Sequence, residues 1–128
     1  MATFSKNERM TSKKEIKWLF EEGRYFSQYP IRVYWYQFDN INQEEPIKVL
    51  VSVARKKLKK AVDRNLLKRR IREAYRKNKY ILHEGLEKKD VAYRIGMVYN
   101  GDKIISSPEV EKKVVVVLKR LKHEMVGK

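Results

Sequence analysis

No cysteine occurs among the 128 residues, which excludes a disulfide framework, a thiolate metal site and a cysteine nucleophile. Only five glycines are present, none of them in a GxGxxG or GK[ST] arrangement, so nucleotide binding has no phosphate loop to support it. No apolar run approaches the roughly 18 residues of a membrane span, and residues 1–10 contain no apolar signal segment. We therefore expect a cytoplasmic protein that does not enter a membrane.

Side chains that could form a catalytic or metal site are also sparse. The two histidines, His83 and His123, stand alone, without the spacing of metal ligands around either. The acidic residues are mostly single among lysines, which suits solvated salt pairing better than a two-metal carboxylate site. The sequence thus predicts no catalytic residue and no metal or cofactor bound at a fixed site on the protein.

The remaining composition indicates an ordinary folded domain. At 42% hydrophobic and 11% aromatic residues, the chain is too apolar for a disordered basic tail. Its length suffices for one domain with a real core and is too short for two comfortable ones. We predict a single domain over residues 1–128, with residues 1–10 flexible.

Positive charge is concentrated in one segment. The chain has 31 Lys and Arg against 16 Asp and Glu, a formal net charge of +15. Residues 55–79 hold thirteen Lys and Arg against two acids, a net +11. Such self-repulsion indicates a polyanionic partner. Nucleic acid is favoured over an anionic membrane, because the basic segment carries no Trp- or Phe-rich insertion face.

Hydrophobic periodicity predicts the element order αβββαβα. Helices are expected at about residues 12–22, 60–78 and 107–125, with a further helical turn at 80–85. Strands are expected at residues 24–27, 31–38, 47–54 and 90–99, the first of them weak. Ser12 with Glu15 forms a capping box, and Ser107 before Pro108 is the expected cap of the last helix.

The central helix separates apolar from basic side chains. At about 100° per residue, one arc holds Leu67, Ile71, Ala74 and Tyr75, the stripe that a surface helix turns to a core. The basic face beside it consists of Arg64, Asn65, Lys68, Arg69, Arg72 and Arg76. The acids that would pair with these cations at i, i+4 are mostly missing, so this face favours polyanion binding over simple solvation.

Aromatic residues supply a second candidate surface. One face of the strand at 31–38 carries Tyr34, Tyr36 and Phe38. These rings either pack under a helix or stack on unpaired bases, and Arg32 on the same face supports stacking. Ile16 and Phe20 on the first helix have the same two alternatives, core packing or ligand contact. The role of Ser52 is likewise open between structure and binding.

A family resemblance rests on three stretches. AVDRNLLKRRIRE, residues 61–73, resembles the A-V-x-R-N-R-x-K-R-x-x-R-[EQ] signature of the protein subunit of bacterial ribonuclease P. SVARKKLKKAV before it is similar to the family's S-V-x-K-K segment with one more loop residue. ERMTSKKEIKWLFEEG is similar to the family's first helix. Leu66 replaces the second Arg of the R-N-R core, and we expect this change to remove one RNA contact.

The resemblance implies both a fold and a function. The fold is an α+β, two-layer α/β sandwich with a left-handed βαβ crossover, related to the second domain of a small-subunit ribosomal protein. The holoenzyme removes the 5′ leader of precursor tRNA, and its RNA subunit holds the Mg²⁺ ions and the chemistry. The protein, a monomer within this ribonucleoprotein, binds the ribonuclease P RNA through the signature helix. It receives the single-stranded leader of precursor tRNA in a cleft between sheet and helices.

The resemblance also assigns residues, carried over by position. The RNA-binding positions it assigns are Lys56, Lys57, Arg64, Asn65, Lys68, Arg69 and Arg72, and the i, i+4 row of the helix adds Arg76. The leader-cleft positions are Ile16, Phe20, Tyr34 and Ser52. Two other readings compete: a ribosomal or other structural RNA-binding protein, and a nuclease whose own residues cut. The signature and reconstitution with a ribonuclease P RNA separate the first rival, and cleavage of precursor tRNA by the protein without RNA would identify the second.

Overall fold

The computed structural model describes residues 4, 6–84, 86 and 90–126. Its elements, in chain order, are η1 (Lys6–Glu8), α1 (Lys13–Glu22), β1 (Arg24–Gln28), β2 (Ile31–Asp39), β3 (Ile47–Val53), α2 (Ala61–Asn78), α3 (Tyr80–His83), β4 (Val91–Tyr99) and α4 (Ser107–Val126). This confirms the predicted order αβββαβα. The expected helical turn is α3, η1 was not predicted, and Gly85 at the end of that turn lies outside the described residues.

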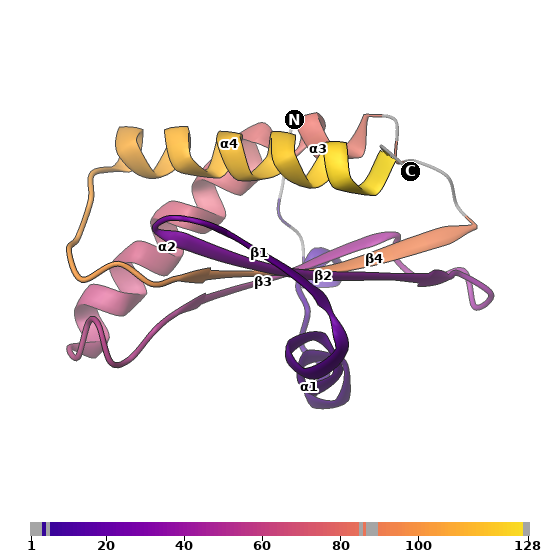
Figure 1. Cartoon of the computed structure of the whole chain (residues 1–128), viewed down its shortest axis with the longest axis horizontal. Helices are drawn as coiled ribbons and strands as arrows, with labels where there is room; N and C mark the ends of the chain where they lie inside the picture. Colours follow the sequence, from indigo (N-terminus) through magenta and orange to yellow (C-terminus); the bar gives the residue numbers. More distant parts are fainter. Residues whose placement is uncertain (1–3, 5, 85, 87–89, 127–128) are drawn as a thin grey trace.

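The strands form one four-stranded sheet in the order β1-β2-β4-β3. β1 pairs with β2 and β2 with β4 in antiparallel fashion, whereas β3 and β4 are parallel. The chain therefore crosses over from β3 through α2 and α3 to reach β4. Figure 1 shows α2, α3 and α4 in a layer on one face of the sheet, with α1 alone against the other face.

The core lies between the sheet and this helical layer. Strand alternation sends every second side chain into it: Ile31, Val33 and Trp35 of β2 are at most 3% exposed. Val114, Val117 and Leu118 of α4 meet these strand residues and are fully buried. The valine run of α4 has a high strand propensity. It nevertheless forms a helix, because the helical spacing of its apolar residues places the buried ones on one face.

The helix ends show one correction. Ser12 Oγ accepts the Glu15 backbone N–H at 3.3 Å, as the capping box predicts. The Ser107 cap is wrong by one residue, because Ser106 Oγ accepts the N–H of Glu109 at 3.3 Å. A capping side chain reaches the N–H three residues on, and Ser106 stands at that distance from Glu109.

Part of the N-terminal segment, for which the sequence suggests flexibility, contacts β3 and α2. Arg9 forms a parallel bridge with Val49, and the Met10 N–H donates to the Val49 carbonyl at 3.0 Å. Met10 is 3% exposed. The Glu8 carboxylate pairs with the Lys79 ammonium at 2.7 Å, which ties this segment to the end of α2.

Candidate nucleic-acid interface

α2 presents its two faces as predicted. Leu67, Ile71, Ala74 and Tyr75 are all buried in the core. The side chains of Asn65, Arg69 and Arg72 are exposed, and those of Lys68 and Arg76 are half-buried. The apolar stripe therefore fixes the rotation of the helix, and this rotation turns the cations outward.

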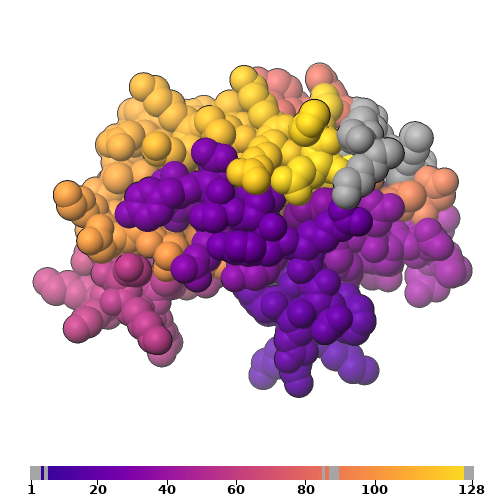
Figure 2. Space-filling model, viewed as in Figure 1, coloured from indigo at the N-terminus to yellow at the C-terminus, as the bar shows by residue number. Residues whose placement is uncertain are grey.

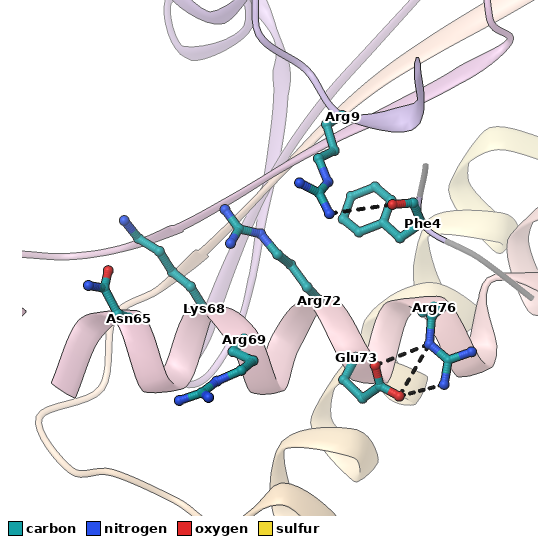
Figure 3. A pocket seen from close by; sticks show the side chains of 8 residues that line it. All are labelled: Phe4, Arg9, Asn65, Lys68, Arg69, Arg72, Glu73 and Arg76. Carbon is teal, nitrogen blue, oxygen red and sulfur yellow. Dashed lines mark hydrogen bonds and ion pairs between the residues drawn. The ribbon is translucent and has the colours of Figure 1, made fainter. Parts of the chain in front are cut away.

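A groove of about 500 Å³ follows this cationic face. It is lined by Phe4, Arg9, Asn65, Lys68, Arg69, Arg72, Glu73 and Arg76. Figure 3 shows Lys68 and Arg72 rising from α2 on the side of the helix where Arg9 and Phe4 form the opposite wall. We call this the basic groove.

The charge of the basic groove is strongly one-sided. Its lining holds five cationic side chains and a single acid, Glu73. The Arg76 Nε donates to that carboxylate at 3.1 Å, and this hydrogen bond lowers the pKa of Glu73 below its usual value. The Glu73 charge is thus matched within the helix, and a positive surface is left for phosphate oxygens.

The wall opposite α2 comes from residues that sequence reasoning did not place in the site. The Phe4 ring packs edge-on to Tyr75, with centroids 5.2 Å apart. The Arg9 guanidinium lies over the Phe4 ring at 5.3 Å. The only hint in the sequence is an aromatic residue followed by Arg9 in a polar segment. The sequence does not indicate that this segment lies opposite α2, because that position depends on the tertiary fold.

Arg64 differs from the other members of its row. Its Nη1 donates to two loop carbonyls, of Leu58 at 2.9 Å and of Lys59 at 2.7 Å, and its side chain is half-buried. It therefore fastens the loop before α2 to the helix. Lys56 and Lys57 in that loop are exposed. Leu66, the departure from the signature, is half-buried.

On the other face of the sheet, Phe20 and Tyr34 come together. Their ring centroids are 4.8 Å apart in an edge-to-face arrangement. α1 can approach this closely because Gly96 lies beneath it: a Cβ on Gly96 would stand 2.9 Å from the Leu19 Cδ2. Phe20 is 39% exposed, so its ring is available for contact.

Ser52 and Ile16 occupy different parts of this face. Strand register aligns Ser52 with Val98 of β4 and Val98 with Arg32 of β2, one row away from Tyr34. Ser52 is half-buried in that row, and Ile16 is half-buried on α1. Figure 2 shows a hollow on this side of the molecule, between α1 and the projecting start of α2 with its loop. We use the name sheet cleft for this side of the sheet, with Ile16, Phe20, Tyr34 and Ser52.

Tyr36 and Phe38 belong to a separate cluster around Arg94. The fully buried Arg94 guanidinium pairs with Glu15 of α1 at 3.0 Å and lies 4.8 Å from the Phe38 ring centroid. The Tyr36 and Phe38 rings lie beside each other at a tilt of 38°, with centroids 6.0 Å apart. Burial, and next the charge of Glu15, raise the pKa of Tyr36. These two rings therefore pack under the first helix.

Within the described part of the chain, neither a cluster of metal ligands nor a membrane-spanning helix is found. Among them, no three or more His, Cys, Asp and Glu side chains gather closely enough to hold a metal ion. None of the helices in the described part of the chain combines the length and apolar character that crossing a bilayer requires.

Together, the fold and the basic groove define a small cationic α+β protein with one extended basic helix face. The model of the Ribonuclease P family matches residues 4–122. The chain therefore belongs to the ribonuclease P protein family, which acts in tRNA processing, and the resemblance expected from its signature is confirmed.

Relatives and solved structures agree with this membership. The chain is 38% identical to the ribonuclease P protein component of Porphyromonas gingivalis over 113 residues, 87% of this chain and 82% of that protein. It is 34% identical to that of Streptococcus pneumoniae over 122 residues, 95% and 90% of the two chains.

Two solved structures share the fold. The RNase P protein of Staphylococcus aureus matches with a TM-score of 0.69 at 22% identity, covering 91% of this chain and 97% of that one. The RNase P protein of Thermotoga maritima matches at 0.66 and 23% identity, covering 88% and 96%.

Proposed function

We propose that this protein is the protein subunit of a cytoplasmic ribonuclease P, in which it binds the RNA subunit and the 5′ leader of precursor tRNA. In this proposal the RNA subunit and its Mg²⁺ carry out the endonucleolytic cleavage. The protein contributes electrostatic and stacking contacts, holds no fixed metal or cofactor, and acts as a monomer within the ribonucleoprotein.

The observation that carries the proposal is the basic groove on the signature helix. Lys68, Arg69 and Arg72 stand at the signature positions and line one continuous cationic surface. Cations in such an array neutralise phosphates and release counterions, which supplies affinity without requiring a particular sequence. Asn65 at the start of the groove adds an amide that can donate to phosphate or to a base edge.

The sheet cleft suits the second ligand, an unpaired leader. Phe20 and Tyr34 form an aromatic pair with one ring exposed. Aromatic faces bind successive unpaired bases with little regard to sequence, whereas paired bases in a duplex hide their faces. Ser52 and Ile16 lie on the same side of the sheet, where a hydroxyl and an apolar contact would line the path of the strand.

Reconstitution tests the proposal. Added to a bacterial ribonuclease P RNA at low Mg²⁺, the protein should raise the rate of precursor-tRNA cleavage, because its cations offset phosphate repulsion that Mg²⁺ otherwise screens. No increase would refute the proposal and favour a structural RNA-binding role. Cleavage by the protein without RNA, abolished by an acid-to-amide substitution, would instead indicate a nuclease.

A further inference from the structure

A third aromatic ring continues the Phe20–Tyr34 pair. The Tyr25 ring of β1 lies 5.1 Å from the Tyr34 ring, centroid to centroid. Tyr25 is 52% exposed, more than Phe20 at 39%, while Tyr34 between them is half-buried. The central ring thus supports two outer rings whose surfaces are open.

The strand pairing explains why Tyr25 stands there. Tyr25 is directly opposite Tyr34 in the antiparallel β1–β2 ladder, so both side chains leave the sheet on the α1 side. Its neighbour Phe26 points the other way and is buried in the core at 5% exposure. β1 is an edge strand of the sheet, so no further strand among the described residues borders Tyr25.

The next row of the same face is polar and positive. It begins with Ser27 on β1 and Arg32 on β2, which pair directly and are both exposed. No described residue forms an ion pair or hydrogen bond with the Arg32 guanidinium. Arg94, on the same face of the sheet, is by contrast paired with Glu15. An open ring beside an open cation matches the two chemical parts of a nucleotide, a base and a phosphate.

We infer that Tyr25 and Arg32 form a second nucleotide subsite, in which an unpaired base stacks on Tyr25 and its phosphate pairs with Arg32. This inference rests on the proposed function, because it extends the leader path from the sheet cleft toward the β1 edge. Nucleic acid is the occupant that the formal net charge of +15 favours over a protein segment. The subsite is engaged only when the leader is long enough to pass Phe20 and Tyr34.

The test measures binding of the reconstituted holoenzyme to mature tRNA and to precursor tRNAs with leaders of increasing length. Tyr25→Ala should leave binding of mature tRNA and of precursors with the shortest leaders unchanged. It should weaken binding of precursors with longer leaders about 5-fold or more, which corresponds to the lower end of the free energy range for stacking one base. Tyr25→Phe should restore binding, since stacking needs the ring and not the hydroxyl. Arg32→Gln should weaken the same long leaders and reduce the salt dependence of their binding.

Tyr80→Ala is the matched control. Tyr80 is 56% exposed, close to Tyr25, but it lies on α3 in the helical layer across the sheet. It should therefore leave binding of every leader unchanged.

Tyr34→Ala distinguishes failure of the inference from failure of the proposed function. If Tyr34→Ala weakens leader binding and Tyr25→Ala and Arg32→Gln do not at any length, the second subsite is wrong and the sheet cleft stands. If Tyr34→Ala has no effect on any leader, the leader-binding part of the proposed function fails first. Equal weakening of mature tRNA by Tyr25→Ala would show that the ring acts on the fold or the RNA subunit and would overturn the subsite.

Discussion

Removing two cations from the basic groove should change how binding of the RNA subunit depends on salt. Lys68 and Arg72 are the suitable pair, because both line the groove and rise from the signature helix on the side of its opposite wall. Arg64 is less suitable, since its Nη1 holds the loop carbonyls of Leu58 and Lys59. Its loss would mix a binding effect with a change in the fold.

The magnitude follows from counterion release. Each phosphate contact contributes about 0.7 to 0.9 to the slope of log K against log salt concentration, so Lys68→Ala with Arg72→Ala should flatten that slope by about 1.4 to 1.8. The double substitution should therefore reduce affinity by a factor that is about 7- to 12-fold larger at 50 mM salt than at 200 mM salt. The effect is thus largest where electrostatics is least screened.

The assay is equilibrium binding of the protein to a bacterial ribonuclease P RNA across this salt range at constant Mg²⁺. Lys112→Ala with Lys119→Ala serves as the control, because it removes the same charge from exposed positions of α4. That control should leave the slope within measurement error of the unsubstituted protein. Equal flattening by both double variants would mean that net charge, and not the basic groove, sets the salt dependence.

Two substitutions should act on stability. Arg64→Ala removes two hydrogen bonds from a half-buried guanidinium and should lower the free energy of unfolding by about 1–3 kcal/mol in urea titration, whereas Lys68→Ala should stay within about 0.5 kcal/mol. Equal losses would remove the structural role assigned to Arg64. Gly96→Ala places a Cβ 2.9 Å from Leu19 and should cost about 1–3 kcal/mol while weakening leader binding more than RNA-subunit binding. Unchanged melting temperature and leader affinity would contradict the close packing of α1.

Local pattern was sufficient for the elements and for the orientation of α2. The buried stripe of Leu67, Ile71 and Tyr75 follows from helical spacing alone, and it fixes the basic face on the other side. Family likeness, not spacing, suggested that Phe20 and Tyr34 share a site. The structure shows that the two rings are in contact, and their role with a leader stays a prediction.

Side-chain partners distant in the chain could not be predicted. Arg94 joins Glu15 across 79 positions and draws Tyr36 and Phe38 into a packed cluster, a choice that strand alternation leaves open. The position of Phe4 and Arg9 in the basic groove could not be predicted either, because it depends on contacts with residues far along the chain. Arg64 is a third example. Helical periodicity predicts the direction of its side chain but not that it donates hydrogen bonds to the Leu58 and Lys59 carbonyls.

The tie between Glu8 and Lys79 has a consequence for assembly. One wall of the basic groove is a short segment whose partners lie 71 positions along the chain, so α2 alone cannot form the groove. A ligand that contacts both walls binds only the closed arrangement and shifts the local equilibrium toward it. An RNA bound in the groove, as proposed above, would therefore also hold η1 against α2, a helix that follows it by more than 50 residues.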